Sequence, residues 1–314
     1  MKTRRTHERR AASSGLDQLP LARVIQVHSL WCDVEIDRSP ALCVVRKTLQ
    51  KVSETRVVVG DFVRVRLDSF HNAAIGSQDS DSRKPTGVVE RIEPRRTILT
   101  RADSFKAMDV HPIVANADQM LIVSSVVMPE VRWGLVDRMI VASRLGGLVP
   151  VLCVNKLDLI QDTPDLIDDT NARLSHYQSL GIRTITTSAT CRIGVDLLRE
   201  VLRSRTTVLA GHSGVGKSSL IRSVEPSLDL RVGEISDMHQ KGKHTTTSAR
   251  IFPVPALSES AVTEVIDTPG VKLFGLWNLT PERLDACFPD VIDGSAPSWR
   301  SESYQRILNG RHET

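Results

Sequence analysis

The most informative segment of the sequence reads Gly211-His212-Ser213-Gly214-Val215-Gly216-Lys217-Ser218-Ser219, directly after a predicted strand at 206–210. It matches the pattern G-x-x-x-x-G-K-[ST] and lies between a strand and a helix, the context that a phosphate-binding loop requires. Glycines allow backbone N–H groups to turn toward phosphate oxygens, and the start of the helix adds partial positive charge. We therefore expect this loop to bind a nucleotide, with Lys217 at the β- and γ-phosphates and Ser218 at Mg²⁺. The competing interpretation is a glycine-rich helix start that binds nothing.

Around this loop, predicted strands and helices alternate from residue 103 onward. The strands are predicted at 119–127, 149–154, 182–187, 206–210 and 261–266, and the helices at 133–145 and around 198–202. Such alternation is typical of an α/β domain with a mostly parallel sheet that is covered on both faces. Ligands bind these sheets at the carboxyl ends of the strands, so the loops there form the candidate site. The domain is predicted over 103–276, followed by a short helical segment over 277–314 with a helix at 301–308.

Two short patterns indicate which base would bind. Asn155-Lys156-Leu157-Asp158 and Ser188-Ala189 each follow a predicted strand. A carboxylate at Asp158 would accept both donors of guanine, N1–H and N2–H₂, whereas adenine has no such pair. Asn155 would then serve the acceptor edge of the base, the Lys156 stem would cover the ring, and the Ala189 N–H would meet O6. Each pattern alone is an ordinary strand-end turn, but beside a phosphate loop they predict a guanine nucleotide.

Candidate metal-binding and switch residues follow the phosphate loop in the chain. Asp267-Thr268-Pro269-Gly270 comes after the last predicted strand. Asp267 would hold Mg²⁺ through water, and the Gly270 N–H would sense the γ-phosphate. In the polar stretch 241–247, one of Thr245, Thr246 and Thr247 would complete the Mg²⁺ shell over a triphosphate, and the pattern does not decide which. The alternatives are an ordinary Pro-Gly turn and a polar loop before a strand.

The N-terminal part of the chain differs in composition from the rest. Residues 1–18 are polar and charged and are predicted to form a basic disordered arm, and short alternating runs at 19–102 predict a small β barrel. The formal net charge of the chain is +4, and residues 1–10 carry five basic side chains against one acidic. This charge favours a polyanion as the partner, although a solubilising arm on a mildly basic surface explains it equally well.

The order of the motifs is unusual. Usual GTPases run from the phosphate loop to N-K-x-D, whereas here the base-reading patterns come first and the cyclic order is preserved, which indicates a circular permutation. This combination resembles the circularly permuted GTPases that assist small ribosomal subunit biogenesis, the RsgA (YjeQ) family, over about residues 20–290. The resemblance implies an OB-fold RNA-binding domain at 19–102. It also implies GTP hydrolysis that is stimulated by the small ribosomal subunit and acts in its late maturation through rRNA binding.

The resemblance further implies a catalytic set of Lys217, His244, Asp267 and Gly270. Val271 follows Gly270, where Ras-like GTPases have a glutamine that orients the attacking water. The family replaces that glutamine with a histidine of the switch segment, here His244, although a contact of His244 with phosphate or rRNA is the alternative. The rival function is that of an RNA-binding assembly factor whose GTP is bound and never turned over. A phosphate-loop ATPase is disfavoured by Asp158.

The family usually ends in a zinc-binding Cys/His cluster after a Phe-Pro-acid segment, and this sequence departs from that pattern. Phe288-Pro289-Asp290 is present, but the tail offers only Cys287 and His312, too few ligands for a structural zinc site, so we expect no zinc. Five cysteines without C-x-x-C spacing predict reduced thiols and a cytoplasmic protein. The longest near-apolar run, 120–128, is too short to cross a bilayer. We expect a monomer that binds neither a membrane nor DNA.

Overall fold

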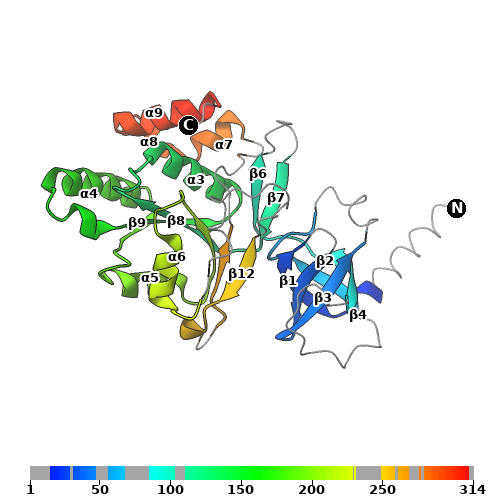
Figure 1. Cartoon of the computed structure of the whole chain (residues 1–314). Coiled ribbons are helices and arrows are strands. Elements are labelled where there is room, and N and C mark those ends of the chain that lie inside the picture. The colour runs from blue at the N-terminus through cyan, green and yellow to red at the C-terminus, as the bar shows by residue number, and fades with distance from the viewer. Residues whose placement is uncertain are drawn as a thin grey trace, which may run out of the picture. The chain divides into compact units, whose positions relative to one another are not determined.

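The computed structural model describes residues 15–28, 31–46, 56–67, 85–102, 110–228, 230, 249–258, 261–268, 276 and 279–310. They divide into two compact units, shown in Figure 1 and described one at a time. The smaller unit takes its described residues from 1–96, 112–116 and 248–251, and the larger unit contains the others. Within these described ranges, no helix combines the length and the apolar character needed to cross a bilayer.

Five strands form a closed, OB-like barrel in the smaller unit. They are β1 (Leu21–Val27), β2 (Trp31–Ile36), β3 (Ser39–Val45), β4 (Phe62–Leu67) and β5 (Gly87–Ile92). β1 pairs with both β2 and β4, β2 pairs with β3, and β5 joins β3 to β4, so the ring closes. Alternate side chains such as Val24, Val34 and Val63 are buried inside. The predicted barrel is therefore confirmed, because the alternation in the sequence matches the period of two of a half-buried strand.

Five parallel strands form the sheet that organises the larger unit. In spatial order they are β10 (Arg183–Thr186), β9 (Val149–Asn155), β8 (Gln119–Ser125), β11 (Thr206–Ala210) and β13 (Glu264–Asp267). Every residue of β8 is buried, as expected for a strand that is covered on both faces. The remaining strands are β12 (Arg250–Pro253), which precedes β13 in the chain, β6 (Ile98–Ala102) and β7 (Val110–Ala115). The predicted parallel sheet is confirmed, with small shifts at the strand ends.

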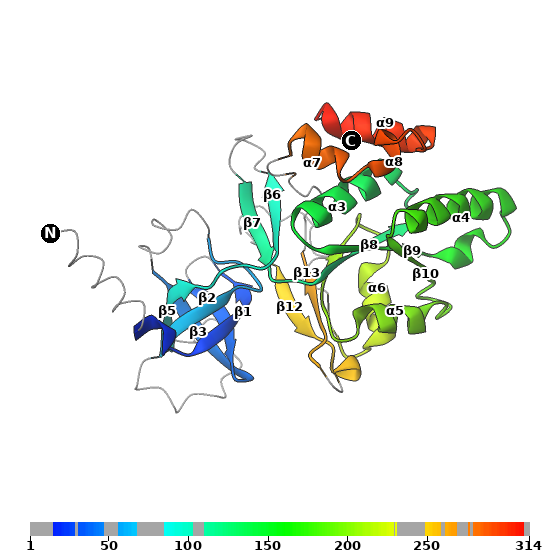
Figure 2. The ribbon, with the colours of Figure 1, turned by 180° about the vertical axis from the view of Figure 1, so that it is seen from behind.

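Helices cover both faces of this sheet. Figures 1 and 2 show α3 (Trp133–Leu145) on one face and α5 (Val195–Leu202) and α6 (Lys217–Val224) on the other. The bounds of α3 are those predicted from the sequence. Short 3₁₀ turns are η1 (Leu157–Ile160) and η3 (Pro255–Leu257). The sequence patterns did not predict α4 (Pro164–Ser179), because only Thr170, Leu174 and Tyr177 of this helix are buried and its apolar stripe is narrow.

Three helices at the end of the chain pack against α3. They are α7 (Pro281–Asp285), α8 (Pro289–Ile292) and α9 (Ser298–Leu308). Leu284 of α7, Ile307 of α9 and Phe288, the N-cap residue of α8, form a buried cluster with Val141 of α3. The last helix begins before the predicted residue 301, because Pro297 takes the extended conformation of an N-cap residue and the helix starts directly after it.

A buried ion-pair network fixes this attachment. Arg300 on α9 is fully buried and donates to Asp137 on α3 and, over 3.2 Å, to Asp290 on α8. On α4, the Tyr177 hydroxyl donates to Asp137 over 2.7 Å, and His176 Nε2 lies 2.8 Å from the Asp290 carboxylate. Burial opposes ionisation of Asp290, but the hydrogen bond to His176 and the charge of Arg300 outweigh it and hold the Asp290 pKa below its ordinary value. The network thus joins four helices.

Removal of Arg300 tests whether this network anchors the last helices. Arg300→Ala leaves two buried carboxylates without their counter-charge, so we expect the free energy of unfolding to fall by about 3–5 kcal/mol, seen as a lower urea midpoint. The matched control is Arg306→Ala on the same helix. Its side chain is 48% exposed and pairs with Glu302, so its loss should cost less than about 1 kcal/mol. Equally small losses from the two variants would show that the network is not an anchor.

Candidate nucleotide-binding site

The glycine-rich loop joins β11 to α6 and depends on its glycines for two reasons. Gly211, Gly214 and Gly216 have φ values of +142°, +83° and +94°, a region that residues with a side chain rarely adopt. Neighbouring atoms add a second constraint at both ends of the loop. A Cβ atom on Gly211 would lie 2.1 Å from the Val123 carbonyl oxygen, and one on Gly216 would lie 2.4 Å from Asn155 Nδ2. The backbone therefore passes closer to β8 and β9 than a side chain would allow.

Lys217 lies across the loop that precedes it. Its Nζ donates to the carbonyl oxygens of Gly211, at 2.9 Å, and His212, at 3.1 Å. The ammonium group is thus held against the loop's own backbone, where a phosphate oxygen would compete with these carbonyls as an acceptor. Within the loop, the side chain of Val215 is buried. The partly buried residues Gly216 and Ser218 and the exposed residues His212, Ser213, Gly214 and Ser219 complete the segment.

Asn155 connects the phosphate loop to a second loop. Its side chain is buried at the end of β9, and its Nδ2 donates to the Val215 carbonyl oxygen over 2.9 Å. Its Oδ1 accepts from the Thr187 hydroxyl and from the Ala189 backbone N–H, both at 3.2 Å. One amide therefore joins loops that follow three different strands. The direct contacts that we expect from Asn155 and from the Ala189 N–H to a base stay predictions, since both groups have protein partners here.

The other residues that we expect to read the base lie in the loops after β9 and β10. Lys156 has a left-handed backbone conformation, and its Nζ donates to the Met128 carbonyl oxygen. Asp158 lies in η1, is partly exposed, and has no hydrogen-bond partner among the described residues. Its carboxylate is therefore available to a ligand. Ser188 is buried and its hydroxyl accepts from the Cys191 N–H over 3.0 Å, so it shapes the loop after β10.

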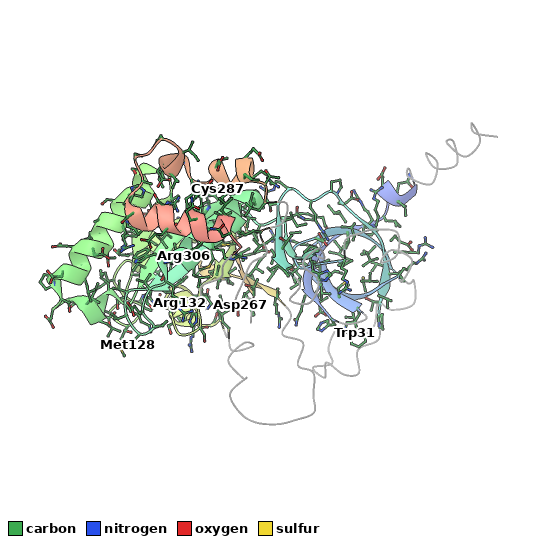
Figure 3. All side chains as sticks on the ribbon, turned by 90° about the horizontal axis from the view of Figure 1, so that it is seen from above. Trp31, Met128, Arg132, Asp267, Cys287 and Arg306 are labelled. Atoms are coloured by element: carbon green, nitrogen blue, oxygen red, sulfur yellow. The ribbon has the colours of Figure 1, made fainter. Side chains whose placement is uncertain are left out.

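Asp267 lies at the carboxyl end of β13, beside the strand that leads into the phosphate loop. Leu209 of β11 is its register partner, and the Thr268 hydroxyl donates to the Leu209 carbonyl oxygen over 3.3 Å. Burial raises the pKa of the Asp267 carboxyl group, while the positive charge of Lys217 and the Thr268 N–H act against it. The predicted acid and the predicted lysine are therefore close enough to interact. Figure 3 shows Asp267 at the edge of the larger unit where Arg132 is also labelled.

The donor chemistry at this position suits magnesium. Ser218 offers a hydroxyl oxygen and Asp267 a carboxylate oxygen, the ligand types that Mg²⁺ prefers. His244, Thr245, Thr246 and Gly270, which we also expect at the site, lie outside the described residues. The part of the chain that the structure describes has no group of three or more His, Cys, Asp and Glu side chains placed to hold a metal ion.

The tail residues considered for zinc do not form a described cluster. Cys287 is buried in the contact between the last helices and α3, and burial raises the pKa of its thiol. Its carbonyl oxygen accepts from Arg144 over 3.1 Å. His312 lies outside the described residues, and the expectation that the chain binds no zinc stays a prediction.

The loop between β8 and α3 is a part of the site that the sequence patterns did not indicate. Pro129 Cδ would lie 3.6 Å from a Cβ atom on Gly214, so this loop packs directly on the phosphate loop. Together they enclose a pocket of about 190 Å³, whose lining includes Ser124, Arg132 and His212. The only signal in the sequence is the pair Met128-Pro129 directly after an apolar run, and such a pair indicates a turn without indicating its neighbours.

The family model and two curated relatives that match this chain are described as RsgA GTPases. The RsgA GTPase family model matches residues 92–277. Small ribosomal subunit biogenesis GTPase RsgA 1 of Vibrio vulnificus is 39% identical over 203 residues, which cover 65% of this chain and 55% of that protein. RsgA of Photorhabdus laumondii is 34% identical over 273 residues, which cover 86% of this chain and 71% of that protein. The chain thus spans about half the length of the Vibrio relative and 71% of the length of the Photorhabdus relative.

Two solved structures share the fold. YjeQ from Thermotoga maritima has a TM-score of 0.67 at 26% identity, over 93% of this chain and 99% of that one. YloQ, described as a circularly permuted GTPase, has a TM-score of 0.63 over 93% of this chain and 95% of that one, and its 21% identity supports the fold alone. The motif order of the present chain agrees with such a permutation, since its phosphate loop follows the N-K-x-D loop. With the family model matching more than half of its length, the chain belongs to the RsgA GTPase family.

Proposed function

We propose that this chain is a GTP hydrolase that is stimulated by the small ribosomal subunit and acts in its late maturation. The observation that carries the proposal is the Asn155 amide, which joins the phosphate loop to the loop that ends in Ala189. These bonds support one site in which a phosphate-binding loop and two base-reading loops act together. The relatives named as small ribosomal subunit biogenesis GTPases support the cellular role.

Guanine selectivity rests on Asp158. Its carboxylate is partly exposed and without a partner among the described residues, so it can accept the N1–H and N2–H₂ donors of guanine. Adenine would leave this carboxylate facing its N1 acceptor, which is unfavourable. The Lys156 stem, held by the bond from its Nζ to Met128, would cover a face of the base.

Charge stabilisation rests on the phosphate loop. Lys217 would exchange its two loop carbonyls for phosphate oxygens, and the loop N–H groups and the start of α6 would add positive potential. Mg²⁺, held by Ser218, Asp267 and Thr245 or Thr246, would supply further neutralisation of the phosphate charge. We assign His244 to the positioning of the attacking water and the Gly270 N–H to the recognition of the γ-phosphate.

The barrel is the proposed OB-fold rRNA-binding domain over 19–102, preceded by the basic arm at 1–18. Arg66 on β4 and Arg46 directly after β3 both pair with Glu90, at 3.2 and 2.8 Å, and both remain about half exposed. Such side chains are suited to phosphate contacts, which make affinity sensitive to salt. The GTPase domain at 103–276 and the helical segment at 277–314 complete the proposed organisation of a monomer that works in the cytoplasm and binds neither DNA nor a membrane.

The primary test measures phosphate release from GTP and from ATP, with and without small ribosomal subunits. We expect turnover that is specific for GTP, slow for the protein alone and faster with subunits. Lys217→Ala should lower it by roughly 10²-fold or more, because the variant removes a preorganised charge at the phosphates. Tight GTP binding without turnover in either condition would favour the rival function, an RNA-binding assembly factor with a structural nucleotide.

A second test concerns base selection. In Asp158→Asn the amide keeps one acceptor and gains a donor, so guanine loses part of its recognition while xanthine, with a carbonyl at C2, gains a partner. We expect the preference for GTP over ATP to fall by about tenfold or more, or about 1.4 kcal/mol, and XTP binding to improve. Fluorescent nucleotide titration measures both. The exposed neighbour Asp162 supplies the control, Asp162→Asn, which should bind as the wild type does, and full GTP preference in Asp158→Asn would identify another base-reading residue.

A third test concerns the water-positioning residue. His244→Ala should lower the single-turnover rate of GTP hydrolysis by about 10²-fold, within the range of general acid–base and positioning effects. The GDP affinity of this variant should stay within twofold of that of the wild type, because His244 would act at the γ-phosphate, which GDP lacks. Unchanged turnover would leave His244 as a phosphate or rRNA contact.

A further inference from the structure

Hydrogen bonds fix the conformation of the loop between β8 and α3, which lies beside the phosphate loop. Residues 126–132 of this loop are here termed the platform. Its ends are joined by the bond from the Val131 N–H to the Val126 carbonyl oxygen at 3.2 Å. The Ser125 hydroxyl donates to the Pro129 carbonyl oxygen over 3.0 Å, and Lys156 Nζ donates to that of Met128. The bond from Lys156 joins the segment 126–132 to the N-K-x-D loop, and Pro129 packs beside Gly214 of the phosphate loop.

The sheet order places this platform opposite Asp267. β11, which leads into the phosphate loop, lies between β8 and β13 and is parallel to both. The carboxyl ends of parallel strands meet at one edge of a sheet. The loop after β8, which carries Arg132, and the end of β13, which carries Asp267, therefore flank the phosphate loop on its two sides. Figure 3 labels both residues.

Arg132 is placed on this platform with its charge available. It is the N-cap residue of α3 and has an extended backbone, with φ −106° and ψ 90°, and its side chain makes no capping bond. The side chain is exposed, lines the pocket shared with His212 of the phosphate loop, and has no hydrogen-bond or ion-pair partner among the described residues. Glu130 lines the same pocket and forms no described ion pair with Arg132. An unneutralised guanidinium thus stands next to an anion-binding loop.

We propose that Arg132 contacts the γ-phosphate of bound GTP and stabilises the charge that develops there during hydrolysis, an inference that rests on the proposed GTPase function. Water forms the new bond to the γ-phosphorus, the bond to the β,γ-bridging oxygen breaks, and GDP leaves with the electron pair. The proton of the attacking water ends on inorganic phosphate or in solvent. Arg132 exchanges no proton, because a guanidinium stays charged and offers paired N–H donors to phosphate oxygens.

The residue that follows Gly270 bears on why an arginine would act at the γ-phosphate. Charge spreads over the equatorial oxygens in phosphoryl transfer, and an arginine supplied in cis or in trans offsets it in several GTPases. Val271 follows Gly270 in this chain, so the position where Ras-like GTPases have a polar glutamine is apolar. A cation on the α3 side of the phosphate loop would supply charge stabilisation, a role distinct from the water positioning that is assigned to His244.

The experiment compares Arg132→Ala and Arg132→Lys with Arg203→Ala in the full-length chain. Arg203 is an exposed arginine directly after α5, before β11 begins, and so lies at the opposite edge of the sheet from the phosphate loop. Three quantities are measured: the affinity for fluorescent GDP, the single-turnover rate with GTP, and the affinity of aluminium fluoride for the complex with GDP and Mg²⁺. The last is a binding measurement that mimics the transferred phosphoryl group and does not depend on turnover.

We expect Arg132→Ala to bind GDP within twofold of the wild type. Its single-turnover rate and its affinity for aluminium fluoride should both fall by at least about tenfold, a conservative part of the 10³–10⁵-fold effect of a catalytic arginine. Arg132→Lys should restore part of both, and Arg203→Ala should match the wild type.

Two results would overturn the assignment while leaving the GTPase function in place. One is a wild type that hydrolyses GTP while Arg132→Ala retains full turnover and full aluminium fluoride affinity. The other is a loss of GDP affinity in Arg132→Ala that equals its loss of turnover, which would assign Arg132 a structural role at the start of α3. A wild type that binds GTP without turning it over would instead refute the proposed function, and the role of Arg132 with it.

Discussion

The buried amide of Asn155 is the interaction on which the candidate site depends. It is bonded to the phosphate loop through Val215 and to the loop after β10 through Thr187 and Ala189. Buried donors and acceptors that lose their partner cost about 1–3 kcal/mol each, so loss of this amide would affect both loops at once. Gly216 is part of the same constraint, because a Cβ atom there would collide with Asn155 Nδ2. The position of the N-K-x-D asparagine therefore requires a glycine at the end of the phosphate loop.

This dependence explains how a permuted chain retains one site. The loops that carry the motifs meet because parallel strands bring their carboxyl ends to one edge of the sheet, and this edge is the same whichever loop comes first in the chain. The order β9-β8-β11-β13 places the N-K-x-D loop, the Arg132 loop, the phosphate loop and Asp267 next to one another. The permutation changes which strand comes last in the chain. Here that strand is β13, and the three final helices follow it.

Those helices return to the part of the domain that borders the phosphate loop. Arg300 binds Asp137 on α3, whose N-cap residue is Arg132 and whose Leu135 and Met139 line the pocket beside the phosphate loop. The candidate γ-phosphate contact thus lies at the N-cap of α3, and the attachment of the last helices lies along the same helix. The polar character of this anchor makes the attachment specific, because a buried guanidinium accepts only a geometry that satisfies both carboxylates.

Local sequence was sufficient for the features that depend on neighbours in the chain. The alternation of the barrel strands, the buried runs of β8 and β9, the exact span of α3 and the phosphate loop all follow from periodicity or from adjacent residue types. Local sequence did not predict α4, since its buried stripe is narrow. It also could not assign partners to Asn155 or Arg300. The bonds of Asn155 reach residues 32 to 60 positions away, and Arg300 meets Asp137 across 163 positions. Such contacts depend on which strands become neighbours and how closely they approach, and only the packing of the folded chain determines that.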